Sequence, residues 1–490
     1  MKRILPGLFV ITLSTFMFSC QKELTEDPGT PSDTTVVTPP SQLDLLRDSV
    51  YLYTKEVYFW HSVIPPYDQF NPRQYAGSTD LESAENVMNA IKALQTNPQD
   101  RFSFVTTKAE SDGLQTGEST DWGFFVKAGS ADLATPIDSV HWYVNYVYDK
   151  SSAGLSGVKR GWYINKINNT TVTYDQAGAN ILNDIFYGTT TVATFEFTKS
   201  DGTVTTIDLN KTSFTANSVL YKNVFTTTSG QKVGYFVFNQ FLGQPSRNEL
   251  NDVFLDLQAA GIDELIIDLR YNHGGSTATQ DTLAEFVAPS TANGKTMYSY
   301  EFNDSLQAGN FPLLKRKPGY SNVSFAKENN TVTYSTANRV NLSRVFVIVS
   351  GETASASELL INNLKPYMDV LLIGDTTYGK PVGFFPIDIF DYSIYPISFR
   401  TINSVGNADY YTGFAPDKTS YDAVDKDWGD VNEDCLFYAL KYIVTGGFRT
   451  ASSASRLARE DMRFKAQVSL KNVRAKLLDH KFSGMFYEKR

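Results

Sequence analysis

The sequence has few of the residues that build disulfides and metal centres. Its 490 residues include only two cysteines, Cys20 and Cys435, and four histidines. The histidines stand at positions 61, 141, 273 and 480 and form no H-x-x-x-H or H-E-x-x-H pair, so no zinc site is expected. Cys435 lies in an apolar helical stretch, which favours packing over chemistry. We predict neither a metal nor another cofactor.

The chain also lacks an excess of positive charge. It carries 44 Lys and Arg against 53 Asp and Glu, a net charge of −9, and it has no recognisable RNA- or DNA-binding motif. This balance favours solubility and argues against a nucleic-acid partner. With 42% hydrophobic and 20% charged residues the composition is that of a globular protein, and the length predicts two or three domains.

Long apolar runs are scarce, and the clearest one lies at the start of the chain. Residues 1–20 combine a basic beginning with an apolar stretch too short for a comfortable membrane span, and they end in a small residue and Cys20. This pattern resembles a bacterial lipoprotein signal. We therefore expect export, lipidation of Cys20 and anchoring on the periplasmic or cell-surface side of the outer membrane, with an ordinary signal peptide as the alternative. Residues 21–40, rich in Pro and Thr, are predicted to be a flexible tether.

The most informative stretch runs from Val345 to Ile361. A β-branched and aromatic run gives way to small polar residues and then to apolar residues at helical spacing. This order predicts a buried strand, a turn and a helix, with Ser355 at the turn. The residues from Ser355 to Glu358 form an S-x-x-E capping box, so helix capping is the simplest interpretation of this serine.

Two other predicted strands end near polar or glycine residues. The apolar run 370–373 leads to Lys380, which lies 25 positions after Ser355, and the run 264–270 leads to Gly274 and Gly275. Paired glycines let backbone N–H groups point into a cleft. Serine, lysine and a glycine pair at strand ends of one α/β sheet form a catalytic arrangement.

The segments 268–275, 353–358 and 374–380 resemble the three signature segments of the C-terminal processing (tail-specific) serine peptidases, and the resemblance covers roughly residues 45–445. It implies a dyad of Ser355 and Lys380. It also implies that the substrates are unfolded or C-terminally tagged proteins, recognised through apolar C-terminal residues. Many members carry a Gln four positions after the Lys, where this sequence has Phe384, so the group that orients the lysine is unassigned.

The dyad requires an uncharged lysine that can accept the serine proton. Burial of Lys380 near Tyr378 and Val382 is expected to lower its pKa. A carboxylate in contact with the amine would keep it protonated, and Asp375 is the nearby residue that would contradict the assignment by making such a contact.

The tetrahedral oxyanion is expected to be held by the backbone N–H of Ala356 and by that of Gly274 or Gly275. A strand-to-helix turn is the structural alternative for the glycines, and both interpretations can hold together. His273 suggests a Ser–His pair instead, but no third member is evident and the lysine spacing fits better.

The fold is predicted to be a multidomain α/β protein. Residues 41–118 are expected to form a helical N-terminal module, residues 213–447 a mixed α/β Ser–Lys protease core, and residues 448–490 a basic, solvent-exposed C-terminal helical tail. Residues 119–212 contain alternating strands and resemble a PDZ domain, with a generic small β domain as the alternative.

The PDZ resemblance implies a peptide-binding loop. It assigns Gly123, Phe124, Phe125 and Val126 to the loop whose backbone N–H groups hold a C-terminal carboxylate, with the bound peptide added to the sheet as a further strand. The sequence therefore predicts an exported serine endopeptidase. One alternative is a catalytically silent lipoprotein of the same fold that binds peptides or apolar ligands, and another is a scaffold whose PDZ-like domain assembles partners.

Overall fold

The structure is a computed structural model that describes residues 39–130, 140–335, 339–448 and 484–487. The predicted signal, Cys20, most of the tether and the predicted helix around residues 468–478 lie outside these ranges. Within the described residues, no helix is both long and apolar enough to cross a bilayer, and no group of three or more His, Cys, Asp or Glu side chains is arranged to hold a metal ion.

The N-terminal part of the described chain is helical, as predicted. Helix α1 buries Leu46, Val50 and Val57 at helical spacing, and the Thr79 side chain caps helix α3 by accepting the N–H of Glu82. The elements are α1 (Gln42–Val57), η1 (His61–Val63), α2 (Tyr67–Phe70), η2 (Pro72–Gln74), α3 (Asp80–Leu94), β1 (Phe104–Thr107) and α4 (Lys108–Thr116). Strand β1 pairs with β19 (Tyr392–Tyr395), so the predicted module 41–118 includes a strand that belongs to a sheet of the core.

The β-rich domain begins and ends at a two-stranded sheet, in which β2 (Glu118–Asp121) pairs with β9 (Thr212–Thr215). Its main sheet has the order β3-β4-β5-β7-β8, so β3 is an edge strand. Trp122, Trp142 and Phe195 fill a separate hydrophobic core. The elements are β3 (Phe124–Ser130), β4 (Val140–Val147), α5 (Ser152–Leu155), β5 (Tyr163–Ile167), β6 (Thr170–Thr171), α6 (Gln176–Tyr187), β7 (Val192–Thr198) and β8 (Val204–Asn210).

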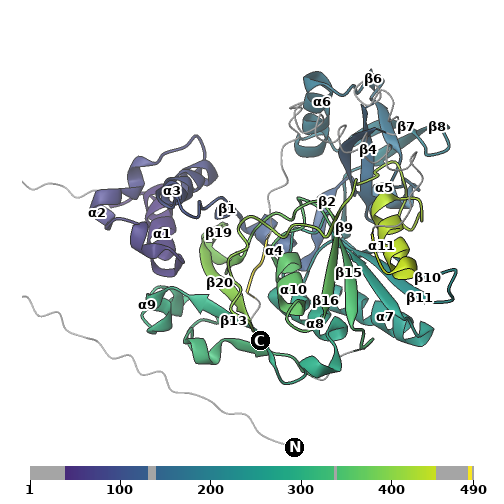
Figure 1. Ribbon diagram of the computed structural model, residues 1–490. Coiled ribbons are helices and arrows are strands. Elements are labelled where there is room, and N and C mark those ends of the chain that lie inside the picture. Colours follow the sequence, from purple (N-terminus) through teal and green to yellow (C-terminus); the bar gives the residue numbers. More distant parts are fainter. Residues whose placement is uncertain (1–38, 131–139, 336–338, 449–483, 488–490) are drawn as a thin grey trace, which may run out of the picture. The chain divides into compact units, whose positions relative to one another are not determined.

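The central sheet of the core has the strand order β10-β11-β12-β15-β16-β21 and is parallel from β11 onward. Alternate residues of its strands face opposite sides, so Val347 shares a buried cluster with residues of α7, α8 and α10, while Phe346 shares one with residues of α11. Figure 1 shows α11 on one face of this sheet and α10 and α8 on the other. The strands are β10 (Val219–Thr226), β11 (Lys232–Phe238), β12 (Glu264–Asp268), β15 (Arg344–Val349), β16 (Asp369–Gly374) and β21 (Lys418–Thr419); the helices are α7 (Gln244–Ala260), α8 (Thr277–Val287), α10 (Ala356–Leu364) and α11 (Asp434–Thr445). This arrangement confirms the predicted mixed α/β core.

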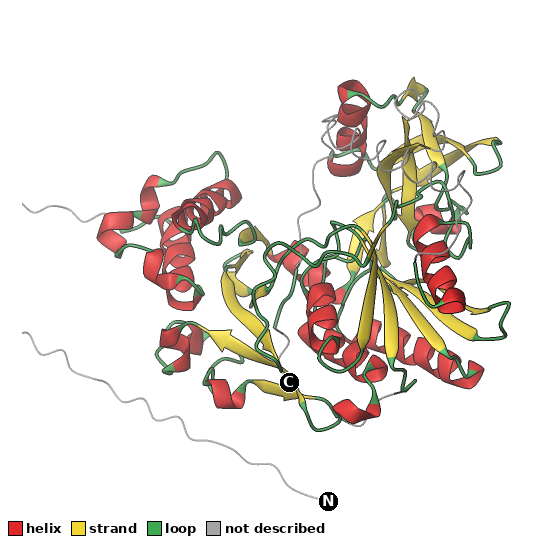
Figure 2. Ribbon diagram, viewed as in Figure 1, coloured by secondary structure: helices red, strands yellow, loops and turns green. Residues whose placement is uncertain are grey.

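A second core sheet has the order β14-β13-β20-β17, and a third consists of β1, β19 and β18. Figure 2 draws the strands of the chain in yellow and its helices in red. The remaining elements are η3 (Ser290–Ala292), β13 (Thr296–Phe302), α9 (Asp304–Gln307), η4 (Leu314–Arg316), η5 (Lys327–Asn329), β14 (Thr331–Thr333), β17 (Val382–Phe384), β18 (Ile387–Ile389) and β20 (Ile397–Asn403). Residues 484–487 form isolated bridges to Ser276 and to Phe384. Residues 484–487 of the predicted tail are therefore extended rather than helical, and their apolar Met485 and Phe486 pack into the core.

Candidate active site

Ser355 lies where strand β15 passes through a short turn into helix α10. The residue is fully buried, and its backbone has φ 61° and ψ −111°, a conformation that non-glycine residues rarely adopt. The neighbouring parallel strands β12 and β16 end at the same edge of the sheet. Their topology brings Gly274 beside the serine, since a Cβ added to Gly274 would lie 2.9 Å from the Ser355 Cβ and 2.9 Å from the Ala356 nitrogen.

The glycine pair after β12 has a backbone that requires glycine. Gly274 and Gly275 have φ values of 102° and 137°, and a Cβ on Gly275 would lie 2.1 Å from the Phe241 oxygen. The Gly274 N–H donates to Asn272 Oδ1 at 2.9 Å. Of the two predicted glycine donors, Gly275 is therefore the better partner for the N–H of Ala356, which belongs to the first turn of α10.

Glu358 joins the two predicted catalytic residues. Its Oε2 accepts the backbone N–H of Ser355 at 2.9 Å and that of Lys380 at 2.8 Å. Its Oε1 accepts the Gly379 N–H at 2.7 Å and the Thr377 hydroxyl at 2.5 Å. Burial raises the pKa of this carboxyl, while the four hydrogen bonds donated to it oppose that shift.

The capping interpretation of Ser355 and its catalytic interpretation are compatible. The glutamate half of the capping box is present, because the Glu358 carboxylate accepts the Ser355 N–H. The serine hydroxyl oxygen accepts a hydrogen bond from the Met485 N–H at 2.6 Å. One side chain, Glu358, thus both caps the helix and ties the serine backbone to the lysine backbone.

Lys380 is fully buried, and two aromatic rings flank its amine. The Nζ atom lies 4.1 Å from the ring centroid of Phe384 and 5.4 Å from that of Phe102. Burial lowers the pKa of the amine well below its ordinary value, while the charges of Asp100 and Glu358 oppose this shift. Phe384, which occupies the position where Gln was expected, therefore supplies part of the apolar surroundings that lower this pKa.

The carboxylates that act on Lys380 differ from the one singled out in the sequence. The Asp375 carboxylate accepts the N–H of Thr376 at 2.8 Å. The charges that raise the Lys380 pKa come instead from Asp100 and Glu358. The Asp100 carboxylate accepts hydrogen bonds from the Tyr58 hydroxyl and from backbone N–H groups of its own loop.

Sequence reasoning missed the contribution of the N-terminal module. Asp100 and Phe102 lie more than 270 positions before Lys380, and no local motif links them to it. Arg101 anchors their loop, because its guanidinium donates to the Tyr378 oxygen at 2.9 Å and lies 4.7 Å from the Tyr378 ring centroid. The sequence predicts only a capping role for Glu358, although the S-x-x-E motif is a usable signal that its carboxylate lies beside Ser355.

A cavity of about 1110 Å³ adjoins the glycine pair. Its lining includes His273, Gly274 and Gly275 from the core and Phe124 and Phe125 from strand β3 of the β-rich domain. The cavity therefore links the predicted peptide-binding segment with one side of the catalytic turn.

The four residues of the predicted carboxylate-binding loop have different surroundings. The Gly123 N–H donates to Asp121 Oδ1 at 2.6 Å, so this amide is already engaged. Phe124 is buried in the domain core, and the partly buried Val126 packs against the same core. The ring centroids of Phe125 and Tyr146 lie 5.0 Å apart. The carboxylate-holding role predicted for Gly123 is therefore not supported, because an aspartate side chain takes its N–H.

Arg270 belongs to a buried charge network rather than to the catalytic turn. Its guanidinium pairs with Asp268 at 2.6 Å and with Asp422 at 3.1 Å, and Asp422 also pairs with Arg160 and Lys127 of the β-rich domain. Burial acts to raise the pKa of Asp422, but the three cations outweigh it and lower that pKa. The network holds the end of β12.

Comparisons with known proteins agree with this geometry. Residues 232–417 match the model of peptidase family S41. The chain is 25% identical over 229 residues to a carboxyl-terminal-processing protease of Picosynechococcus sp., a match that spans 47% of each protein. It is 25% identical over 186 residues to the carboxy-terminal processing protease CtpA of Bacillus subtilis, across 36% of this chain and 34% of that protein. The chain thus matches half or less of the length of these curated relatives.

The fold is similar to that of a crystal structure assigned to the S41 proteases, from Bacteroides fragilis. The TM-score is 0.61 and the sequence identity 22%, over 81% of this chain and 97% of the other. At this identity the likeness concerns the fold. Residues 232–417, which include Ser355, Lys380 and the glycine pair, are thus similar in sequence to peptidase family S41.

Proposed function

We propose that the protein is a serine endopeptidase that uses Ser355 as nucleophile and Lys380 as general base. The observation that carries this proposal is the carboxylate of Glu358, one oxygen of which accepts the backbone N–H groups of both residues. A shared acceptor fixes the two backbones with respect to each other, which is the pre-organisation that a dyad requires. Burial lowers the pKa of Lys380, which favours the uncharged form of the amine that a general base must have.

In the proposed reaction, the Ser355 oxygen attacks a peptide carbonyl and its proton passes to Lys380 Nζ. The oxyanion of the tetrahedral intermediate is held by the N–H groups of Ala356 and Gly275, and each such donor contributes about 3 kcal/mol in other hydrolases. Lys380 then protonates the leaving amine. Water, deprotonated by the same amine, hydrolyses the acyl-enzyme and restores the serine.

The proposed substrates are unfolded or C-terminally tagged proteins with apolar C-terminal residues. Among the described residues, β3 lies at the edge of its sheet, and an extended peptide can add to such an edge as a further strand. Phe124 and Phe125 of this strand line the cavity that reaches Gly275. A PDZ-like role for residues 119–212 is therefore part of the proposal, with the edge of β3 as the binding element instead of the Gly123 amide.

The test is digestion of an unfolded reporter with an apolar C-terminal tail by wild type, Ser355→Ala and Lys380→Ala, across about pH 6 to 9. We expect cleavage by wild type alone, with a rate that rises as Lys380 loses its proton. Equal cleavage by all three proteins would refute the dyad, because the activity would then come from another group or from a contaminant.

A catalytically silent binder of the same fold is the second candidate, and Phe384 is the observation that favours it. Its ring contacts the lysine amine where Gln was expected. A wild type that binds the reporter tail without cleaving it at any pH would support this alternative, and Phe384→Gln would then be the variant in which to look for recovered cleavage.

We also propose that the protein is exported and anchored through a lipid on Cys20. The support is the signal-like character of residues 1–20 and the tether-like composition of residues 21–40. Mass spectrometry of the mature N-terminus should show an acylated Cys20, and Cys20→Ser should release the protein from the membrane fraction. An unmodified N-terminus generated by cleavage elsewhere would contradict the anchor.

A further inference from the structure

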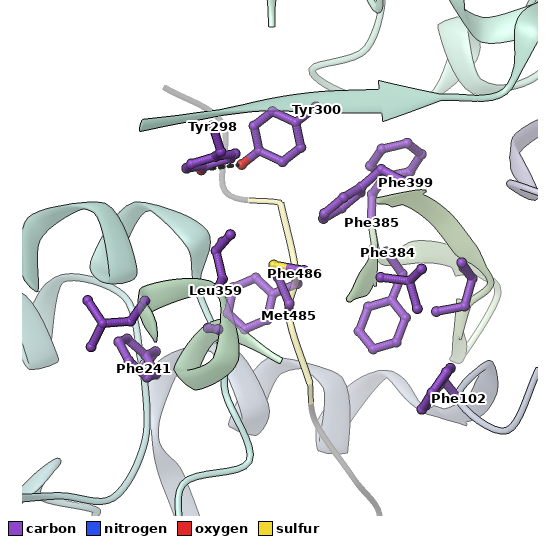
Figure 3. Close-up of a cluster of buried hydrophobic side chains, with 14 of the residues drawn as sticks. Phe102, Phe241, Tyr298, Tyr300, Leu359, Phe384, Phe385, Phe399, Met485 and Phe486 are labelled. Atoms are coloured by element: carbon purple, nitrogen blue, oxygen red, sulfur yellow. Dashed lines mark hydrogen bonds between the residues drawn. The ribbon is translucent and has the colours of Figure 1, made fainter. Parts of the chain in front are cut away.

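The chain's own C-terminal segment lies beside the catalytic serine. Residues 484–487 are extended and run between the glycine turn on one side and strand β17 on the other (Figure 3). Phe486 donates its N–H to the Gly275 oxygen at 3.1 Å and accepts the Thr277 N–H at 3.2 Å. On the other side, Phe384 donates to the Met485 oxygen and accepts from Tyr487, both at 3.1 Å.

These four hydrogen bonds are those of a peptide added as a strand between two existing backbone edges. Both bridges, to Ser276 and to Phe384, are parallel. Strand addition of this kind is how many proteins hold an extended peptide, because the main chain supplies affinity and side-chain pockets supply selectivity. The segment is therefore bound in the manner expected of a peptide ligand.

A fifth hydrogen bond connects the segment with the nucleophile. The Met485 N–H donates to Ser355 Oγ at 2.6 Å. This bond uses a lone pair of the oxygen that must attack a carbonyl. The Gly484–Met485 peptide is not among the cis bonds, so its C=O points away from its N–H and away from the serine. The Ser355 hydroxyl thus faces the N–H side of the Gly484–Met485 peptide. In this geometry the oxygen cannot attack the carbonyl carbon of that peptide.

The side chains of the segment are buried in apolar surroundings. Met485 is fully buried and Phe486 is 7% exposed. The ring of Tyr487 lies 5.3 Å from that of Tyr300 and 6.2 Å from that of Phe385. Figure 3 shows Met485 and Phe486 between Leu359 of α10 and the phenylalanines of the second core sheet. These contacts define sites for successive apolar residues and then an aromatic one.

Glycine allows the close approach of the segment. A Cβ on Gly383 would lie 2.7 Å from the Met485 oxygen, so a side chain at this position would push the segment away. Ser355 itself has no exposed surface while the segment is in place. A protein substrate therefore cannot reach the hydroxyl until residues 484–487 move.

We propose that residues 484–487 are an intramolecular pseudosubstrate that occupies the peptide-binding groove at Ser355 and keeps the peptidase inactive until a substrate displaces them. This inference rests on the proposed peptidase function and adds its regulation. It also defines the ligands of the groove as extended peptides with two successive apolar residues followed by an aromatic residue, bound parallel to Phe384. The alternative is that the segment is a permanent part of the fold.

The first test measures binding and does not depend on catalysis. A Ser355→Ala chain receives a recognition sequence for a site-specific protease between residues 449 and 483, and the folded protein is cut after purification. The probe is a fluorescent peptide with the sequence of residues 482–490, and its affinity is measured by anisotropy before and after the cut. Because a tethered segment competes at an effective concentration on the order of millimolar, we expect the cut protein, once separated from the released segment, to bind the probe at least about tenfold more tightly.

Equal affinity before and after the cut would overturn the proposal, as would the absence of probe binding to a cut protein that retains its circular dichroism spectrum. A probe with Asp in place of the residues equivalent to Met485 and Phe486 should not bind. Binding of that altered probe at the same affinity would contradict the apolar sites. Because both arms carry Ser355→Ala, a failure of the proposed peptidase activity cannot imitate any of these results.

The second test measures turnover in the full chain. Phe486→Asp should weaken the segment and raise the cleavage rate of the reporter severalfold or more. The control Val405→Asp, at a residue that is 74% exposed and lies outside the β-rich domain, should leave the rate unchanged. Intact mass of the wild type should show an uncut C-terminus. Loss of residues 485–490 in wild type but not in Ser355→Ala would show that the segment is cleaved as a substrate and would overturn the pseudosubstrate pose.

Discussion

The substitution Glu358→Gln tests the link between the two proposed catalytic residues, Ser355 and Lys380, with almost no change in shape. A glutamine keeps one oxygen and replaces the other by an NH2 group, which cannot accept hydrogen bonds. Two orientations of the amide are possible. With its oxygen at the Oε2 position it still accepts from Ser355 and Lys380, whereas the opposite orientation leaves both of their N–H groups without an acceptor.

The first orientation is therefore the favoured one, and its cost follows from the other oxygen. The Gly379 N–H loses its acceptor, while the Thr377 hydroxyl can turn to accept from the new NH2 group. A buried N–H without a partner costs about 1–3 kcal/mol. We expect local stability around Gly379 to fall by this amount, and the turnover of the enzyme to fall by up to about 10²-fold if the loop that carries Lys380 shifts by an ångström.

Hydrogen exchange resolved to single amides measures this effect directly. In Glu358→Gln the Gly379 amide should exchange roughly 5- to 150-fold faster than in wild type, whereas the Ser355 and Lys380 amides should retain most of their protection. The matched control is Glu110→Gln, which alters the exposed glutamate of the capping box of α4 and should leave all three amides unchanged. Unchanged exchange at Gly379 together with unchanged turnover would refute the role assigned to Glu358.

Three further predictions concern the lysine and the glycine turn. Lys380→Met should abolish cleavage and yet stabilise the fold. Folding lowers the pKa of Lys380, so between that pKa and about pH 10.4 the unfolded wild type binds more protons than the folded one, and wild-type stability rises with pH. The difference in melting temperature between Lys380→Met and wild type should therefore narrow from pH 6 to pH 9, and a widening difference would contradict the sign of the pKa shift. Phe384→Gln should move the acid limb of the pH–rate profile to higher pH, because an amide oxygen near the Lys380 amine favours the charged form of the amine. Phe384→Leu should leave the limb in place. A shift to lower pH in Phe384→Gln would exclude the apolar role of the ring. Gly275→Ala should abolish activity and destabilise the core, because the added Cβ would lie 2.1 Å from the Phe241 oxygen. In the control Gly202→Ala no atom beyond the two chain neighbours lies within 4 Å of the added Cβ, so this variant should lose only the free energy of the backbone strain at its positive φ. Equal melting temperatures for the two variants would contradict the argument.

The core of the site was predictable because its signals are local. A strand that ends in small residues and a helix that begins with S-x-x-E placed Ser355 at a turn, and the parallel strands that follow from βα alternation bring Lys380 and Gly275 to the same edge. The mixed α/β fold was predictable for the same reason. The choice of Gly275 over Gly274 was not, because it depends on a hydrogen bond from the Gly274 N–H to Asn272.

The parts that sequence reasoning missed depend on contacts between distant segments. The Phe102 ring lies near Lys380 because β1 pairs with β19 and Arg101 contacts Tyr378, and no periodicity of the sequence reveals these contacts. Likewise, the short apolar run Met485–Phe486 follows a polar and basic stretch, so composition favoured a solvated tail. The run is buried because it pairs with the backbone at Ser276 and at Phe384, and these two segments come together only in the folded core. The engaged N–H of Gly123 also depends on a side chain, that of Asp121.

The central claim is that Ser355 is a nucleophile activated by Lys380. The most direct measurement is the rate of covalent labelling by a serine-directed fluorophosphonate, mapped by peptide mass spectrometry in the chain freed of residues 484–490 by cleavage after folding. The account predicts a single adduct on Ser355, formed faster as the pH rises through the lowered pKa of Lys380 and lost in Lys380→Ala. Labelling of Ser355 at equal rates in wild type and Lys380→Ala, or no adduct on Ser355 at any pH, would contradict it.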